Sequence, residues 1–328
     1  MNGSVSAPGE GFQGEWFEAG DGARLFLRRW LPSGKPLGAV HIVHGMAEHG
    51  LRYDRFARRL TGEGFAVWAA DMRGHGKTAD PAVNDPGKGG LLGHCGDRDA
   101  HKRVVDDIEE INRRIRVSLP EQPLFLMGHS WGSFLVQGNI EEYGAHIGGC
   151  ILSGTRGPGG PKIRTAPVLL TAIAALKGCR KKSELAFILG DKPYNRPFRP
   201  NRTPFDWLSR DESEVDAYLR DPRSGMRCSS GFYRDLVILL NRIHQSEQME
   251  RIRRDLPVYV FAGSADPVGD MGASPTALVE AYRSLKIQDL EFVLYPDARH
   301  ETLNETNRDE VTGDLIAWLK KHIRQRQE

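Results

Sequence analysis

The chain has 328 residues, of which 39% are hydrophobic and 27% charged, a balance typical of a globular protein with one or two domains. The formal net charge of +2 excludes a bulk electrostatic affinity for nucleic acid. The sequence contains no run of about twenty apolar residues, so we expect no membrane-spanning helix. Residues 1–14 lack the basic and then apolar pattern of a signal peptide, which favours a cytoplasmic location.

Predicted strands and helices alternate in the first 154 residues. A β-hairpin is predicted where residues 15–18 and 25–30 alternate in polarity around a Gly-Asp-Gly turn. After it, apolar runs and amphipathic stretches predict strand 39–43, helix 53–62, strand 65–70, helix 97–117, strand 124–127, helix 135–143 and strand 150–152. The order implies a parallel sheet with helices on both faces. In the long helix we expect the acidic residues to face solvent: Asp106, Asp107, Glu109 and Glu110.

A long insertion interrupts this alternation after Gly154. Its composition is rich in proline and aromatic residues, and helical periodicity appears at residues 167–176, 213–219 and 233–244. Strand and helix patterns then resume at 258–261, 275–285, 290–295 and 309–323. We therefore predict an α/β core of residues 1–154 and 251–328, with residues 155–250 as an inserted, mainly helical cap.

A Gly-x-Ser-x-Gly pattern at residues 128–132 places Ser130 between a predicted strand and a predicted helix. Such a turn holds a serine hydroxyl clear of the backbone, and the helix start adds free N–H groups beside it. A chance occurrence in a glycine-rich chain is the alternative for the five letters alone. The strand before and the helix after favour a nucleophile.

A serine nucleophile needs a base and an acid that orients the base. Functional residues of open parallel sheets lie just past the carboxyl ends of strands. This rule selects His300, after the last predicted strand, and Asp266, after the strand before it. Asp270 and Asp297 are rival acids, and a turn-forming Asp266 or a surface His300 are the alternatives. The predicted catalytic residues are Ser130, Asp266 and His300.

An oxyanion hole for this serine requires two backbone N–H groups. We expect them from Trp131, which follows the nucleophile, and from Met46, in the loop after strand 39–43. His44 in that loop is either a structural residue beneath it or a metal ligand with His41 or His49. No carboxylate or cysteine joins them at ligand spacing, so we predict no metal and no cofactor.

Four motifs carry a resemblance to a known family: His-Gly-Met-Ala-Glu-His at 44–49, Asp-Met-Arg-Gly-His-Gly at 71–76, Gly-His-Ser-Trp-Gly at 128–132 and Arg-His-Glu at 299–301. Together with Arg52-Tyr53 and Asn304-Glu305, they resemble the signatures of monoacylglycerol lipases and bacterial lysophospholipases, which are serine aminopeptidase S33-like. The resemblance extends from about residue 17 to 323. The segment 201–209 resembles the cap of bacterial members.

This resemblance implies an α/β-hydrolase fold and hydrolysis of carboxylic esters of monoacylglycerol or lysophospholipid type through an acyl-serine. It also implies the triad and oxyanion donors named above. A peptidase or amidase of the same fold, with Glu212 or Glu214 as anchor for a substrate amine, is one alternative. A non-catalytic binding module is the other.

The cap is expected to shape the substrate pocket, with Tyr194, Phe205 and Trp207 as candidate lining residues. The alternative is that its aromatic residues form the cap's own core. The family often has methionine where Trp131 stands, so the larger ring is expected to narrow the acyl pocket. Three arginines of the cap are candidates to attract a phosphate headgroup, with a solvated surface as the alternative: Arg196, Arg199 and Arg202. Membrane contact is expected to be peripheral at most, through the cap.

The four cysteines are widely spaced and form no Cys-x-x-Cys pair: Cys95, Cys150, Cys179 and Cys228. For a cytoplasmic protein this arrangement predicts reduced thiols, not disulfides or a metal centre.

Overall fold

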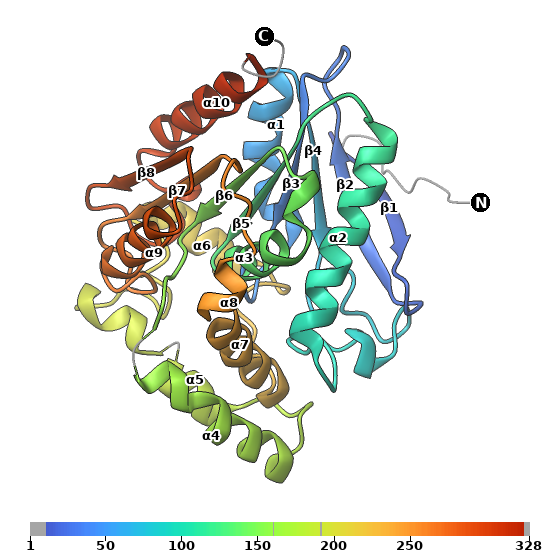
Figure 1. The fold of residues 1–328 in the computed structure, drawn as a ribbon. Helices are drawn as coiled ribbons and strands as arrows, with labels where there is room; N and C mark the ends of the chain where they lie inside the picture. The colour runs from blue at the N-terminus through green and yellow to red at the C-terminus, as the bar shows by residue number, and fades with distance from the viewer. Residues whose placement is uncertain (1–10, 160, 191, 325–328) are drawn as a thin grey trace.

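A twisted sheet runs through the middle of the molecule (Figure 1). The computed structural model describes residues 11–159, 161–190 and 192–324. In these ranges eight strands form one sheet, in the spatial order β1 (Gln13–Glu18), β2 (Arg24–Trp30), β4 (Phe65–Asp71), β3 (Gly38–Val43), β5 (Leu124–His129), β6 (Gly149–Ser153), β7 (Val258–Gly263) and β8 (Leu290–Tyr295). From β4 to β8 in this order, each strand is parallel to the next. The predicted parallel sheet is confirmed.

The first two strands form the predicted antiparallel hairpin, and β2 pairs antiparallel with β4. Trp16 lies opposite Phe26, with ring centroids 5.2 Å apart. The turn is closed by a hydrogen bond from the Gly22 N–H to the Ala19 carbonyl (2.8 Å). The hairpin therefore extends the sheet at the edge far from β8.

Helices cover both faces of the sheet, as the alternation predicted. On one face lie α1 (Asp54–Gly62) and α10 (Arg308–Arg324), which bury Leu60 and Leu315 in one apolar cluster. A second cluster on the other face is formed with α2 (Ala100–Ser118), α3 (Trp131–Tyr143) and α9 (Ala273–Ser284). This doubly wound arrangement is the α/β-hydrolase architecture expected from the sequence.

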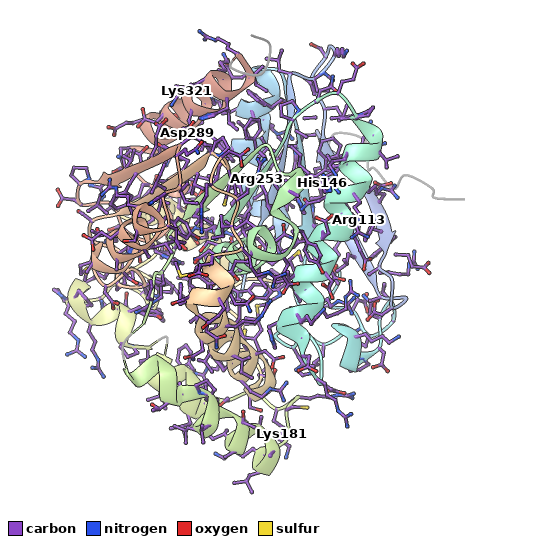
Figure 2. The ribbon with its side chains drawn as sticks, in the orientation of Figure 1. Arg113, His146, Lys181, Arg253, Asp289 and Lys321 are labelled. Carbon is purple, nitrogen blue, oxygen red and sulfur yellow. The ribbon has the colours of Figure 1, made fainter. Side chains whose placement is uncertain are left out.

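The prediction that all four acidic residues of α2 face solvent is wrong for two of them. Asp107 is fully buried and accepts hydrogen bonds from Arg73 (2.6 and 2.9 Å). Glu109 is buried as well and accepts hydrogen bonds from Arg116 (3.0 Å) and Arg113 (3.1 Å). Figure 2 labels Arg113 on this helix. Arginine side chains from the helix and from the loop after β4 cover these carboxylates, a pairing that helical periodicity cannot indicate.

Between β6 and β7 the chain forms a separate group of helices, seen below the sheet in Figure 1. They are α4 (Pro161–Lys177), α5 (Glu184–Gly190), η4 (Lys192–Phe198), α6 (Glu212–Arg220), α7 (Ser230–Arg242) and α8 (Ser246–Met249). Helix α7 packs against α4 and also against α2 and α3, so it joins this group to the sheet layer. The exact division into core and cap stays a prediction.

The composition predicted reduced cysteines and no membrane-spanning helix. All four cysteines are free thiols, and only Cys179 is partly exposed. Across the described ranges, every helix is too short or too polar to cross a membrane.

Candidate active site

Ser130 occupies the turn between β5 and α3 in a strained conformation. Its φ of +51° lies in the region that residues with a side chain rarely adopt, at a typical cost of about 1–3 kcal/mol. The flanking glycines make the turn possible, because a Cβ at Gly128 would lie 2.4 Å from the Gly132 carbonyl oxygen. A Cβ at Gly132 would lie 2.2 Å from the carbonyl oxygen of Val43. The sharp turn thus brings α3 close to the end of β3, while the Ser130 N–H still donates to the Ser153 carbonyl of β6 (2.9 Å).

Asp266 and His300 lie where the strand-end rule placed them, after β7 and β8. Their side chains are buried, and the Nδ1 of His300 is 2.9 Å from Asp266 Oδ2. A carboxylate only accepts hydrogen bonds, so the proton is assigned to Nδ1, which leaves Nε2 as an acceptor. The other Asp266 oxygen accepts from the Val268 N–H (2.8 Å). Asp266 is therefore held on both oxygens and fixes the imidazole.

The two rival acids lie elsewhere. Asp270 is exposed and forms an ion pair with Arg156 (2.6 Å). Asp297 is exposed, and its backbone N–H donates to the Ser264 hydroxyl (2.8 Å). Neither is bonded to His300, so the structure brings Asp266, and not its rivals, together with the histidine.

The charges around His300 favour its protonated form. Burial by itself lowers its pKa, but the neighbouring Asp266 carboxylate outweighs burial, and the pKa lies above its ordinary value. The ring of His129 lies 4.7 Å from that of His300, and burial together with His300 lowers the pKa of His129 to about 4. His129 is therefore neutral at physiological pH and adds no charge beside the base.

The two predicted oxyanion donors are unoccupied backbone groups. Among the described residues, no acceptor takes a hydrogen bond from the N–H of Met46 or of Trp131. Trp131 is the first residue of α3, where backbone N–H groups have no partner inside the helix. Their assignment as an oxyanion hole stays a prediction.

Of the two alternatives for His44, a structural residue or a metal ligand, the hydrogen bonds favour the structural residue. Its Nε2 accepts a hydrogen bond from the Met72 N–H (2.9 Å), and Nδ1 lies 2.7 Å from the Gly45 carbonyl oxygen. His41 instead contacts Asn112 (2.8 Å), and His49 contacts Asp221 (2.5 Å). The three histidines thus make separate hydrogen bonds and do not converge on one point.

A buried ion-pair network ties the Met46 loop to the histidine loop. Arg52 donates to Glu48 (2.8 Å) and with both terminal nitrogens to Glu301 (2.6 and 2.7 Å). Glu48 in turn accepts from the backbone N–H of Gly45 (2.5 Å) and from the Tyr53 hydroxyl (2.9 Å). One guanidinium therefore connects the loop that carries Met46 to the residue next to His300.

The network keeps both carboxylates ionised. Burial raises the pKa of Glu301, but the Arg52 guanidinium outweighs burial and holds that pKa at about 2. Burial also raises the pKa of Glu48 and Arg52 lowers it, and the pKa of Glu48 lies below its ordinary value. In the sequence these residues were only letters of a family motif, and the network was not predicted. Two acids and an arginine in short motifs around the site were the only signal.

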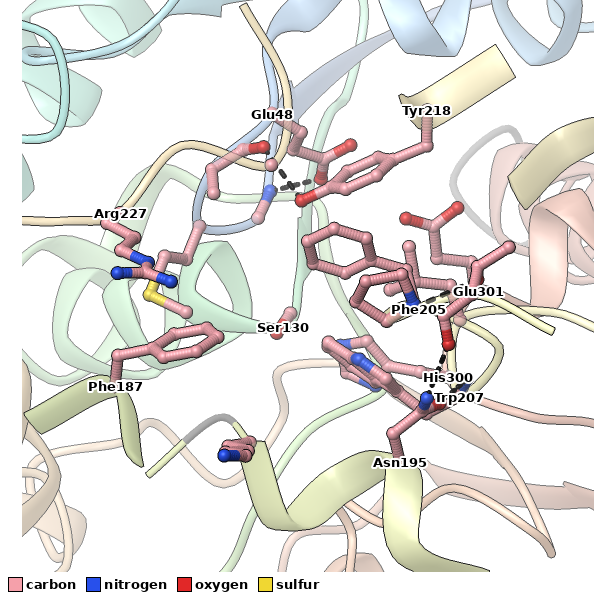
Figure 3. A pocket seen from close by; sticks show the side chains of 18 of the residues that line it. Glu48, Ser130, Phe187, Asn195, Phe205, Trp207, Tyr218, Arg227, His300 and Glu301 are labelled. Carbon is pink, nitrogen blue, oxygen red and sulfur yellow. Dashed lines mark hydrogen bonds between the residues drawn. The ribbon is translucent and has the colours of Figure 1, made fainter. Parts of the chain in front are cut away.

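A cavity of about 840 Å³ opens above Ser130. Figure 3 shows Ser130 at its centre, with Phe187 and Arg227 on one side and His300 and Trp207 on the other. Its volume lies in the range of small-molecule sites. Cap residues thus share one cavity with Ser130 and His300.

Of the three predicted pocket residues, Phe205 and Trp207 line this cavity. Tyr194 lies behind the wall, with its ring 5.2 Å from that of Trp207. The Trp207 ring is in turn 5.2 Å from His300, and the Trp207 carbonyl accepts from the His300 N–H (3.4 Å). The cap therefore contacts the histidine loop directly.

The expectation that Trp131 narrows the pocket is wrong. Its ring is buried and stacks on His75 at 5.0 Å, and Phe232 of α7 lies 5.1 Å away. Trp131 is absent from the described residues that line the cavity. Its side chain packs against the rings of His75 and Phe232, which provide a buried surface away from the cavity.

One group of possible metal ligands lies away from this cavity. Within the described parts of the chain, only His94, Asp97 and Cys179 bring three ligand atoms within 4.8 Å of one another. Asp97 already accepts hydrogen bonds from the guanidinium of Arg180 on both oxygens (2.8 and 2.6 Å). A cation here would meet the positive charge of Arg180, so the cluster is better suited to joining cap and core.

Comparisons with known proteins agree over most of the chain. A family model described as serine aminopeptidase, S33, matches residues 34–307. The chain is 29% identical to the monoglyceride lipase of Mus musculus over 318 residues, which cover 92% of this chain and 89% of that protein. It is 27% identical to the monoacylglycerol lipase of Mycolicibacterium smegmatis over 303 residues, or 92% and 95% of the two chains.

A solved structure is similar over nearly the whole length. The highly thermostable carboxyl esterase from Bacillus coagulans, in complex with glycerol, superposes with a TM-score of 0.85 at 28% identity. The likeness covers 95% of this chain and 99% of that one. It therefore includes the helices between β6 and β7 as well as the sheet.

Proposed function

The chain belongs to the serine aminopeptidase S33 family, as a hydrolase of the monoacylglycerol lipase-like α/β type, and from this premise we propose that it cleaves carboxylic esters of monoacylglycerol or lysophospholipid type. One observation carries the proposal: Ser130, on its strained turn, lines the same cavity as His300, whose Nδ1 is bonded to Asp266. Along the chain these three residues follow the order serine, acid, histidine, which is the order of α/β-hydrolases.

In the proposed mechanism Ser130 Oγ attacks the ester carbonyl while His300 Nε2 takes the hydroxyl proton. Asp266 stabilises the imidazolium, consistent with the upward shift of the His300 pKa, which burial alone would lower. The proton then passes to the leaving alcohol, and the acyl group stays on Ser130. Water, deprotonated by His300, attacks the acyl-serine and releases the carboxylic acid.

Stabilisation of the oxyanion falls to the backbone N–H groups of Met46 and Trp131. One such donor typically lowers the activation barrier by about 2.7–4 kcal/mol. The Met46 loop is supported from the core by the Gly45 N–H bond to Glu48 and from the cap by two bonds to the Ala47 carbonyl, from Tyr218 (3.0 Å) and Gly225 (2.9 Å). A loop fixed from both sides has its donor aimed before substrate arrives.

The apolar side chains of the cavity favour an acyl chain over a peptide. Phe187, Ile188 and Phe205 line it beside Ser130. An aminopeptidase needs a free carboxylate for the substrate amine, yet Glu214 is bonded to Arg55, and neither it nor Glu212 lines the cavity. These observations favour the ester over the amide alternative.

The test combines labelling with turnover. Wild-type protein should react with a fluorophosphonate probe and hydrolyse 1-octanoylglycerol and p-nitrophenyl butyrate, whereas Ser130→Ala should do neither while remaining folded by circular dichroism. Ser118→Ala is the matched control, because its hydroxyl lies on α2, outside the cavity, and donates to the Arg114 carbonyl (3.0 Å). Labelling that persists in Ser130→Ala would sink the assignment, and faster cleavage of an aminoacyl arylamide would favour a peptidase.

A further inference from the structure

Among the described residues, the walls of the cavity carry more positive than negative side chains. Five basic residues of the cap line it: Lys192, Arg196, Arg199, Arg202 and Arg227. Three acidic residues line it: Glu48, Glu184 and Glu301. Binding an apolar acyl chain does not require this excess of positive charge, so the basic side chains need another explanation.

Most of the other charges are neutralised within the protein. Glu48 and Glu301 are both bonded to Arg52. Arg227, beside Phe187 in Figure 3, forms an ion pair with Glu184. Each acidic residue on the described part of the wall is therefore paired with an arginine, and Glu48 and Glu301 share the single Arg52.

Arg202 is paired as well, with Asp216 (2.7 Å) and Glu212 (3.7 Å). Lys192, Arg196 and Arg199 are different. Among the described residues, no carboxylate forms an ion pair with any of these three. On the described part of the wall, these three positive charges therefore have no carboxylate partner.

These three residues come from one short segment. Lys192 and Arg196 belong to the 3-10 helix η4, and Arg199 follows its end. Arg196 and Arg199 both line the cavity, so the two side chains border the same space. An anionic group in that space would lie within reach of this basic segment.

Buried contacts hold this segment in place. Asn195 of η4 is buried, donates to the Thr203 carbonyl (2.7 Å) and accepts from the Trp207 N–H (3.0 Å). The Arg299 guanidinium lies 4.3 Å from the ring centre of Phe198 and donates to the Ser209 carbonyl (3.0 Å). Because Arg299 precedes His300, the basic segment is fixed relative to the histidine loop.

We propose that Lys192, Arg196 and Arg199 form a subsite for a phosphate group, and that the preferred substrates are monoacyl esters with a phosphorylated glycerol headgroup. This inference rests on the proposed ester hydrolysis. Guanidinium groups bind phosphate oxygens through paired N–H donors, and a lysine adds a point charge. Only a glycerol backbone separates such a phosphate from the acyl carbonyl, so headgroup and carbonyl fit one cavity.

The experiment compares two substrates of equal chain length below their micelle concentrations: 1-octanoylglycerol and 1-octanoylglycerol 3-phosphate. Monomeric substrates remove any effect of a charged lipid surface. Wild-type protein should show a kcat/KM about tenfold higher for the phosphorylated ester, equivalent to about 1.4 kcal/mol. The triple variant Lys192→Ala, Arg196→Ala, Arg199→Ala should lose this preference, because its kcat/KM should fall more for the phosphorylated ester than for the neutral one.

The matched control removes three charges from the same cap, outside the cavity: Lys177→Ala, Lys181→Ala and Lys182→Ala. Lys181 lies near the lower end of the cap in Figure 2. The control should keep the wild-type preference, and inorganic phosphate should inhibit neutral-ester hydrolysis in wild type more than in the triple variant.

Three results would overturn the inference while leaving ester hydrolysis intact. They are equal use of both esters by wild type, an equal loss of preference in the control, and equal inhibition of wild type and triple variant by phosphate. Hydrolysis of neither ester by wild type would overturn the proposed function together with it.

Discussion

Arg52 gives the most direct test of the buried charges that support the site. Replacing it with methionine keeps an unbranched side chain but removes the charge that links Glu48 to Glu301. Removing one partner of a buried ion pair costs about 3–5 kcal/mol, because the remaining charge is left without compensation. We expect Arg52→Met to lose about 4 kcal/mol of unfolding free energy near neutral pH, a large share of the usual 5–15 kcal/mol.

The pH dependence of this loss identifies its cause. Burial raises the pKa of Glu301, but in the wild type Arg52 holds it at about 2, so its contribution to stability is present above about pH 4.5 and is lost as the pH falls toward 2. In the variant the Arg52 charge no longer offsets burial, so we expect the pKa of Glu48 and Glu301 to rise above the unfolded values. Stability is then lost as the pH rises above about 4.5, so the deficit should grow between about pH 5 and about pH 8.

Urea denaturation followed by tryptophan fluorescence at the two pH values measures this deficit. Arg52→Lys should show a smaller loss with little pH dependence, because it keeps the charge but not the planar fork. Lys35→Met is the control, since the Lys35–Glu121 pair is exposed and should leave the denaturation midpoint unchanged. A deficit of equal size at both pH values would refute the reasoning, because it would show that the carboxylates are not its source.

Two further predictions concern single titrating groups. Asp266 holds the pKa of His300 above 6.5 against the opposing effect of burial, so the rate of fluorophosphonate labelling should rise with pH through a midpoint above 6.5, and Asp266→Asn should lower that midpoint. A midpoint that is unchanged in Asp266→Asn would contradict this. Burial raises the pKa of Glu141 on α3 to about 9, and no described group bonds to its carboxylate, so its contribution to stability is lost as the pH rises from about 4.5 toward 9. Glu141→Gln should therefore exceed wild type by at least about 2 kcal/mol of unfolding free energy near pH 8 and by less near pH 5, and a pH-independent difference would exclude this cause.

The sheet and the positions of the chemical groups were predictable because both depend on local patterns. Apolar runs marked β3, β5 and β7, and the strand-end rule then selected Asp266 and His300, which the structure places 2.9 Å apart. The glycines around Ser130 were predictable for the same reason, since a side chain there collides with the adjacent backbone. In each case a short stretch of sequence determines the geometry.

Side-chain partners distant in sequence could not be predicted. Asp107 was expected to face solvent, yet Arg73 from another loop covers it, and the pairing spans 34 positions. Arg52 and Glu301 are 249 positions apart, and Asn195 fixes Trp207 only because the cap folds back on itself. Periodicity gives the buried face of a helix but not the charged residue that another segment brings to it.

Trp131 shows how this limit affects substrate specificity. Its place in the nucleophile motif indicated a ring in the acyl pocket, but the ring is buried against His75 and Phe232, whereas Phe205 of the cap lines the cavity. Trp131→Met should therefore lower the unfolding free energy by about 1–3 kcal/mol and leave the chain-length preference for p-nitrophenyl esters unchanged. Phe205→Ala, the matched change in the cavity wall, should shift that preference toward longer or branched acyl groups. An equal shift in Trp131→Met would mean that the indole reaches the substrate, contrary to its buried position.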